Sequence, residues 1–257
     1  TYGGNAGRGA YRLVVETSRA IECARSEVAA FLGVHDTSRL SFQPSATQGL
    51  NLALKGLIQP GDRIVVSGAE HNAVRRPLNQ LAAWGATVVI VPTDDRGFID
   101  PDAVEEAVSQ EPTRAVVCQH VNNITGVIQP VADIADIAHE HGATFIVDGA
   151  QAGGHIPVNL DTLGADVWAC SGHKGLLGPA GIAVLYCAPG TDPDELVSGG
   201  GPGAGDEPFQ PADGPSRYES GTMNTPGILG LAAGCRYLSS HSTAIRSEEH
   251  RLTSRLY

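Results

Sequence analysis

Short apolar runs alternate along the chain with longer segments in which apolar residues recur at helical spacing. The short runs predict seven strands, at residues 39–45, 62–68, 87–92, 114–120, 144–150, 165–172 and 181–187. The longer segments predict helices at residues 8–32, 47–57, 73–85, 100–110, 131–142 and from 226 onward. Several strands are apolar throughout, which is typical of a sheet that is buried on both faces. We therefore predict an α/β fold in which helices cover both faces of a largely parallel sheet.

Polar residues follow five of these predicted strands. They are Ser45-Ala46-Thr47, Glu70-His71, Asn122-Asn123, Asp148, and Ser171 to Lys174. In a parallel sheet the carboxyl ends of the strands meet at one edge, and ligands bind in the crevice there. The sequence therefore predicts a functional site at this edge of the sheet.

Charge and cysteine content limit the choice of partners and compartment. The 257 residues carry a formal net charge of −11, and such an acidic surface makes nucleic acid and anionic membranes poor partners. The sequence contains no apolar run long enough to cross a membrane and no recognisable signal peptide. The five cysteines are widely spaced, without the spacing of a metal site. We expect reduced, mostly buried thiols in a cytoplasmic protein that binds no metal.

Lys174 is unusual because the chain otherwise uses arginine for positive charge. Lys55 and Lys174 stand against fifteen arginines. A partly desolvated lysine amine attacks carbonyl groups, whereas arginine stays protonated and does not. The nearby Gly172, Gly175 and Gly178 are expected to let the backbone approach a ligand closely. A lone lysine in a loop is more often a solvated charge, so this interpretation depends on the neighbouring residues.

Asp148 is the residue that changes the interpretation of Lys174. It ends an apolar run and is expected near burial, where a carboxylate needs a cationic or donating partner. Twenty-six residues separate it from Lys174, which leaves room for one strand–crossover–strand unit that lets both face one crevice. A lysine imine together with an acid that pairs with a ring nitrogen is the mark of pyridoxal phosphate binding. The alternative is an aspartate that only caps the end of a strand.

Further side chains fit the same cofactor. Residues 45–49 open a helix after a strand, so that backbone N–H groups and the Thr47 hydroxyl offer a site for a phosphate. His71 is placed to stack on a planar ring, and Asn123 and Gln151 are placed to donate to its phenolic oxygen. Each of these residues alone is more often structural, Thr47 for example as a plain helix N-cap. Together, at successive strand ends, they favour the cofactor.

Six motifs resemble those of a known family. SATQGLNLAL, AEHNAVRRP, HVNNITGV, VDGAQAGG, SGHKGLLGPAG and YESGTMNTPGI occur in this order along the chain. They resemble the class V aminotransferases of pyridoxal phosphate fold type I, especially the cysteine desulfurase and selenocysteine lyase branch. The resemblance covers nearly the whole chain. It implies a three-layer α/β/α large domain with a mainly parallel seven-stranded sheet.

The resemblance also implies catalytic and substrate-binding roles. Lys174 would hold the cofactor as a Schiff base and later carry a proton. Asp148 would pair with the pyridinium nitrogen, and His71 would stack on the ring and act as an acid or base. Arg8 would border the entrance for an amino-acid substrate.

Other residues would bind the cofactor's oxygens, according to the same resemblance. Asn123 and Gln151 would lie near the phenolic oxygen. The phosphate would be held by Ala46, Thr47, Ser171 and His173. Gly221 and Thr222 would reach the phosphate of a neighbouring subunit, which implies a homodimer with shared sites.

The resemblance predicts a two-domain organisation. Residues 1–225 would form the cofactor-binding large domain without the family's first strand, and residues 226–257 a helix that leads into a small C-terminal domain, mostly absent from this chain. The last residues have the pattern of an unfinished helix. We therefore expect the chain to be part of a longer protein, whose persulfide-forming cysteine and substrate-binding arginine lie beyond residue 257.

The leading functional expectation is a cysteine desulfurase, which removes sulfur from L-cysteine and leaves L-alanine and a persulfide for a sulfur-acceptor protein. One alternative is a selenocysteine lyase or another pyridoxal phosphate enzyme that cleaves a β-carbon–sulfur bond. Another is a class V aminotransferase or epimerase. A non-enzymatic alternative is an inactive cofactor domain that serves as a scaffold, against which the joint presence of Lys174 and Asp148 argues.

Overall fold

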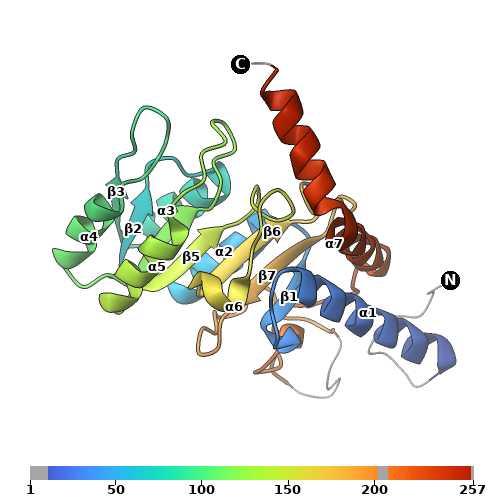
Figure 1. Ribbon diagram of the computed structural model, residues 1–257. Coiled ribbons are helices and arrows are strands. Elements are labelled where there is room, and N and C mark those ends of the chain that lie inside the picture. The colour runs from blue at the N-terminus through green and yellow to red at the C-terminus, as the bar shows by residue number, and fades with distance from the viewer. Residues whose placement is uncertain (1–10, 202–207, 256–257) are drawn as a thin grey trace.

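The computed structural model describes residues 11–201 and 208–255 and shows one seven-stranded sheet between two layers of helices (Figure 1). The strands are β1 (Leu40–Gln43), β2 (Arg63–Ser67), β3 (Thr87–Val91), β4 (Ala115–Gln119), β5 (Thr144–Asp148), β6 (Val167–Ser171) and β7 (Ala183–Cys187). The α-helices are α1 (Arg12–Phe31), α2 (Ala46–Leu57), α3 (Asn72–Ala83), α4 (Pro101–Ser109), α5 (Val131–Glu140), α6 (Leu160–Leu163) and α7 (Thr225–Thr253). Two 3₁₀ turns are η1 (Thr37–Arg39) and η2 (Pro215–Arg217). The seven predicted strands are confirmed.

The strands lie in the order β1-β7-β6-β5-β4-β2-β3. Among the described strands every pairing is parallel except the two made by β7, with β1 and with β6. The mainly parallel sheet is therefore confirmed. Strand β7 runs the other way because residues 172–182, which join it to β6, contain no crossover helix that would return the chain to the starting edge.

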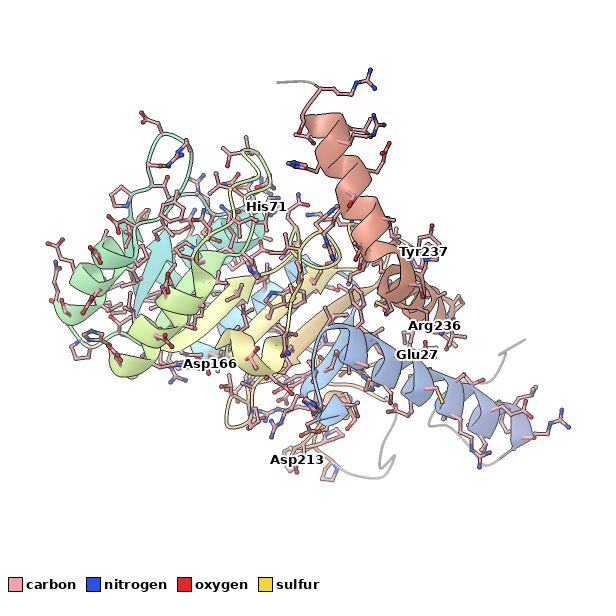
Figure 2. The ribbon with its side chains drawn as sticks, viewed as in Figure 1. Glu27, His71, Asp166, Asp213, Arg236 and Tyr237 are labelled. Atoms are coloured by element: carbon pink, nitrogen blue, oxygen red, sulfur yellow. The ribbon has the colours of Figure 1, made fainter. Side chains whose placement is uncertain are left out.

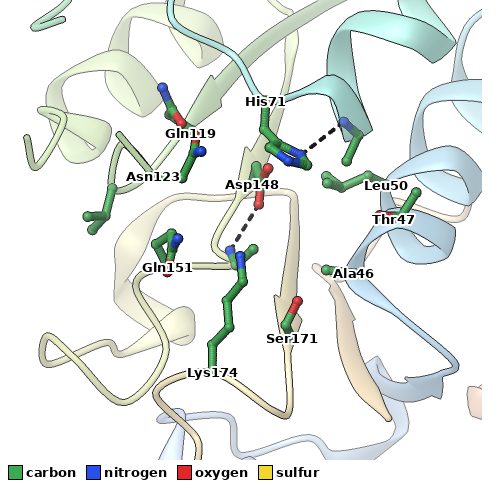
Figure 3. A pocket seen from close by; sticks show the side chains of 13 residues that line it. Ala46, Thr47, Leu50, His71, Gln119, Asn123, Asp148, Gln151, Ser171 and Lys174 are labelled. Atoms are coloured by element: carbon green, nitrogen blue, oxygen red, sulfur yellow. Dashed lines mark hydrogen bonds between the residues drawn. The ribbon is translucent and has the colours of Figure 1, made fainter. Parts of the chain in front are cut away.

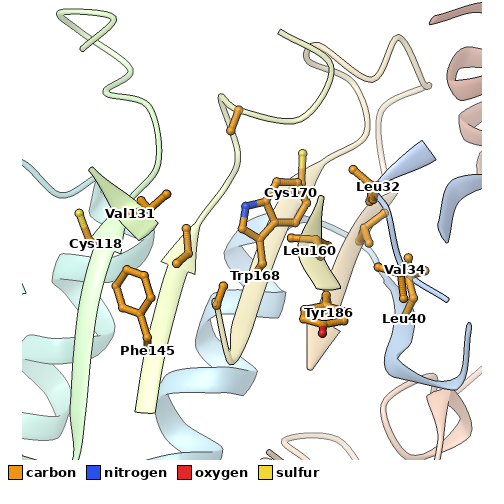
Figure 4. Packing of buried hydrophobic residues seen from close by; sticks show 14 of the residues in the cluster. Leu32, Val34, Leu40, Cys118, Val131, Phe145, Leu160, Trp168, Cys170 and Tyr186 are labelled. Atoms are coloured by element: carbon orange, nitrogen blue, oxygen red, sulfur yellow. The ribbon is translucent and has the colours of Figure 1, made fainter. Parts of the chain in front are cut away.

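Two hydrophobic clusters fill the space on the two faces of the sheet. Helices α2 and α3 pack on one face, whereas α1, α4, α5, α6 and α7 supply the cluster on the other. We call the cluster at α2 and α3 the first cluster and the one on the other face the second. Side chains along β5 point alternately to the two faces, since Phe145 and Val147 belong to the second cluster and Ile146 to the first. Figure 4 shows Phe145 and the fully buried Trp168 in the second cluster. Both faces are covered, which confirms the three-layer arrangement.

The helices differ from the prediction in two places. The first begins at Arg12, and residues 8–10 of the predicted helix lie outside the described residues. The short helix α6 was not predicted. The last helix, α7, runs unbroken over 29 residues, as the prediction of a helix from residue 226 onward allows. Its first half contains Gly230 and Gly234, where a Cβ would come within 2.9 Å of Pro179 and 2.3 Å of the Leu176 carbonyl. These glycines serve close packing on the loop after β6 and do not end the helix.

None of the helices in the described part of the chain combines the length and the apolar character needed to cross a membrane.

Candidate functional site

A cavity opens at the carboxyl ends of β1, β2, β4, β5 and β6 (Figure 3). The empty space in and around it is about 370 Å³, a figure that includes open solvent at its mouth. Eight of the predicted site residues line it, namely Ala46, Thr47, His71, Asn123, Asp148, Gln151, Ser171 and Lys174. The amine of Lys174 and the carboxylate of Asp148 thus belong to one cavity, although they come from different strand ends.

The first turn of α2 forms one wall of the cavity. Ser45 is the N-cap of this helix, and its hydroxyl accepts a hydrogen bond from the Gln48 N–H at 3.2 Å. Thr47 is therefore not the cap, and its side chain lines the cavity. The backbone N–H groups of Ala46 and Thr47 belong to the first turn of a 12-residue helix, where no helical carbonyl is available to them. This wall is suited to bind an anion.

Asp148 is the buried charged group of the cavity. Its side chain accepts one hydrogen bond from the described residues, from the Ala150 N–H at 2.9 Å, and the residue is 5% exposed. Burial raises the pKa of this carboxyl, and the Ala150 N–H, His71 and Lys174 act in the opposite direction. A cationic or N–H-bearing ligand next to the free oxygen would relieve the cost of burying the charge.

Backbone packing between two loops fixes the position of Lys174. Gly154, with φ of +86°, follows β5, and a Cβ there would lie 2.0 Å from the carbonyl oxygen of Gly175. A Cβ on Gly175 would in turn lie 2.4 Å from the carbonyl oxygen of Gly153. The loop that carries Lys174 therefore rests directly on the loop that follows Asp148. Only glycine allows this approach.

The other glycines near Lys174 also pack closely on the protein. A Cβ on Gly172 would come within 2.7 Å of the Ile182 carbonyl oxygen, and one on Gly178 within 3.0 Å of the Gly172 carbonyl oxygen. Together with Gly175, they hold the lysine loop in shape.

His71 is both a helix cap and a lining residue. Its Nδ1 accepts a hydrogen bond from the Ala73 N–H at 3.0 Å, at the start of α3. In the neutral ring the proton therefore sits on Nε2. The cap fixes the tautomer and the ring position at the edge of the cavity.

The sequence analysis missed one lining residue, Gln119, and gave no sign of the burial of another residue at this edge, Glu70. Gln119 lines the cavity and pairs in register with Asp148 on the neighbouring strand; its place as the polar last residue of an apolar strand is the signal that could have found it. Glu70 lies beneath the cavity, and its Oε1 accepts from the Ser67 hydroxyl at 2.5 Å and from the Gln119 N–H at 2.8 Å. Burial, with Asp148 nearby, raises the pKa of Glu70 to about 8. Nothing local in the sequence indicates that burial.

Two predicted site residues lie elsewhere, and a third falls outside the described residues. His173 is exposed and does not line the cavity, although Ser171 and Lys174 on either side of it do. Thr222 is exposed and lines a separate cavity, together with Phe42 and Glu219. Arg8 lies outside the described residues.

The fold and the cavity can now be compared with known proteins. The family model described as "Aminotransferase class-V" matches residues 1–257. The chain belongs to the class V aminotransferase family. A curated "Probable cysteine desulfurase" from Methanothermobacter thermautotrophicus is 35% identical over 266 residues, covering 98% of this chain and 66% of the relative.

Solved structures of class V aminotransferase relatives agree with this assignment. "Apo structure of Cysteine Desulfurase from Thermococcus onnurineus NA1" superimposes with a TM-score of 0.91 at 35% identity, covering 99% of this chain and 65% of that one. "SspA in complex with cysteine" gives a TM-score of 0.79 at 30% identity, with 91% and 65% covered. The chain spans between 41% and 66% of the length of the curated relatives that it matches.

Proposed function

We propose that the protein carrying this chain is a pyridoxal phosphate-dependent cysteine desulfurase, which converts L-cysteine to L-alanine and leaves the sulfur as a persulfide. The observation that carries the proposal is that Lys174 and Asp148, the amine and the carboxylate that this cofactor requires, line one cavity. Relatives at about one third identity named as cysteine desulfurases support the choice among class V reactions.

The residues of the cavity fit the cofactor in their chemistry. The N-terminus of α2 and Ser171 offer N–H and hydroxyl donors for a phosphate. Asp148 has a second carboxylate oxygen that accepts no hydrogen bond from the described residues and would suit a protonated ring nitrogen. Asn123 and Gln151 place side-chain amides in the same space, where they would donate to a phenolic oxygen. When bound, pyridoxal phosphate supplies an electron sink for the bonding electrons of the amino-acid α-carbon.

The protein's own groups divide the proton chemistry between them. Lys174 is held at the cavity by the glycine contacts, and its amine would act there as a nucleophile towards a carbonyl carbon and as a base towards a substrate α-proton. Asp148, when ionised, would keep a proton on the ring nitrogen. His71 presents a fixed tautomer whose Nδ1 is occupied by Ala73, so that Nε2 is the atom free to exchange a proton.

The sulfur acceptor has to come from outside the described cavity. None of the five cysteines lines it. Cys118, Cys170, Cys187 and Cys235 are buried, and burial raises the pKa of each thiol, which makes them poor nucleophiles. Cys23 is exposed, in a groove between α1 and α7. We propose that the acceptor thiol belongs to a mobile segment of the full protein or to a partner protein.

We further propose that two copies share their sites, with Gly221 and Thr222 binding the cofactor phosphate of the second copy. Thr222 is exposed and does not line the cavity of its own chain, so it is available to a neighbour. In this proposal residues 1–225 form the cofactor domain, and α7 leads into a second domain.

The test is to load the full protein with pyridoxal phosphate, add L-cysteine and measure alanine. We expect alanine from the wild type and from Lys55→Ala, the matched control with the other lysine removed. Lys174→Ala should form none and should lose the visible absorption of the bound cofactor. A keto acid in place of alanine would contradict the desulfurase proposal and favour a transaminase.

A further inference from the structure

A buried ion pair lies outside the cavity, between helix α1 and the segment that precedes α7. Arg25 and Glu219 are each 2% exposed in their side chains. The guanidinium donates two hydrogen bonds to the carboxylate, Nη1 to Oε1 at 2.6 Å and Nη2 to Oε2 at 2.9 Å. A two-point contact of this kind fixes the orientation of both groups as well as their distance.

The pair also closes the outer edge of the sheet. Strand β1 is the last strand on its side and pairs only with β7. On its open side, the Leu40 carbonyl accepts from Arg25 Nη1 at 2.9 Å, and the Phe42 N–H donates to Glu219 Oε1 at 2.6 Å. Arg25 and Glu219 therefore satisfy backbone groups that a further strand would otherwise pair.

Glu219 leads directly into Gly221 and Thr222. Ser220 donates to the Val197 carbonyl at 2.6 Å and accepts from Gln210 Nε2 at 3.0 Å. The Gly221 N–H donates to the Gly200 carbonyl at 2.6 Å. The segment is thus anchored at one buried point and at two points on the neighbouring loop, after which Thr222 emerges into solvent.

We propose that the Arg25–Glu219 pair is a positioning clamp, which sets the place of Gly221 and Thr222 for binding the phosphate in the cavity of a second copy. The proposal rests on the shared-site arrangement of the proposed function. Neither Arg25 nor Glu219 lines the cavity. They act through the segment that follows Glu219 on the edge of β1.

The first experiment measures the dissociation constant of pyridoxal phosphate by absorbance in three variants of the full protein. Glu219→Gln removes the charge and keeps the shape, and Thr222→Val removes only the hydroxyl. Both should raise the dissociation constant, by about tenfold to a hundredfold for the loss of a hydrogen bond to a charged phosphate. The matched control is Glu27→Gln, which breaks the ion pair of Glu27 on α1 with Arg236 on α7 (Figure 2). That variant leaves the edge of β1 intact and should bind the cofactor like the wild type.

The second experiment separates action on the partner from action within one chain. Glu219→Gln subunits, which retain Lys174, are mixed with Lys174→Ala subunits, which retain the intact clamp. In the mixed dimer the intact clamp faces the site that has Lys174, so the proposal predicts that this site regains the affinity of the wild type. Should Glu219→Gln not fold, Gln210→Ala loosens the same segment from its solvent side and replaces it in the mixture.

The outcomes separate the two claims. If Thr222→Val leaves cofactor affinity unchanged, the shared-site role of Thr222 in the proposed function is wrong. If Thr222→Val weakens binding but Glu219→Gln and Gln210→Ala do not, the clamp is refuted and the shared site stands. A mixed dimer that shows no recovery also refutes the clamp, because the defect then stays within the mutated chain.

Discussion

Replacing Glu70 by glutamine removes one carboxyl group from beneath the cavity while keeping the size of the side chain. Glu70 is 6% exposed, and its Oε2 is buried without a hydrogen-bond partner among the described residues. Its Oε1 accepts from Ser67 and Gln119, and a glutamine oxygen would keep both bonds. The charge of Asp148 on β5 raises the pKa of Glu70, and the charge of Glu70 raises the pKa of Cys118 on β4. Charge is therefore the main property that the substitution changes.

The magnitude follows from proton linkage. Burial raises the pKa of Glu70 from 4.5 to about 8 in the folded protein. Between these two pH values the folded state holds a proton that the unfolded state has released, so stability falls as pH rises. One pKa unit corresponds to about 1.36 kcal/mol. The wild type should therefore lose about 3 kcal/mol of unfolding free energy between pH 5 and pH 7.5 through this group alone, and Glu70→Gln should not.

The assay is urea denaturation of the cofactor-free protein at several pH values, for the wild type and Glu70→Gln. The unfolding free energy of the variant minus that of the wild type should increase with pH by about 3 kcal/mol across this range. Glu105→Gln on the exposed face of α4 is the matched control, and its curve should run parallel to that of the wild type. A difference for Glu70→Gln that stays constant or shrinks with rising pH would refute the reasoning.

Three other substitutions test the architecture of the site. Asp148→Asn should raise the unfolding free energy of the cofactor-free protein at neutral pH, because burial raises the pKa of this carboxyl. The same variant should bind the cofactor at least about tenfold more weakly. A lower unfolding free energy in urea denaturation would contradict the first expectation. Gly154→Ala should lower the unfolding free energy by about 1–3 kcal/mol, since φ is +86° and the Gly175 carbonyl blocks a Cβ; calorimetry showing no change would contradict the loop packing. Leu177 has a φ of 56°, so Leu177→Gly should raise the unfolding free energy by about 0.5–1 kcal/mol, and a lower melting temperature would count against that strain.

The strand pattern could be predicted from the sequence because burial on both faces leaves a local mark. Strands such as β4 and β5 are apolar runs between turns, and the residues at or just after their carboxyl ends, Asp148 among them, stand out as polar. The rule that parallel strands present their carboxyl ends at one edge then brings these residues together. For this reason most of the residues that line the cavity could be predicted from the sequence.

The remaining features depend on contacts between distant segments. Glu70 precedes helix α3, and its sequence position is typical of an acidic residue near a helix N-terminus. Its burial depends on another strand, whose Gln119 N–H donates to the Glu70 carboxylate. Arg25 occupies a helical position like any exposed arginine, and its partner Glu219 lies 194 residues away. The glycines around Lys174 are visible in the sequence, but whether they admit a ligand or another loop depends on the fold.

The central claim is that Lys174 is the amine that holds the cofactor opposite Asp148. The chain has one other lysine, Lys55 on α2, whose amine lies 5.9 Å from the ring centre of Trp84. The direct measurement is borohydride reduction of the loaded protein, which fixes the cofactor on the amine that carries it, followed by peptide mass mapping. The account predicts the added mass on the peptide that contains Lys174. Added mass on the Lys55 peptide, or on neither lysine, would contradict it.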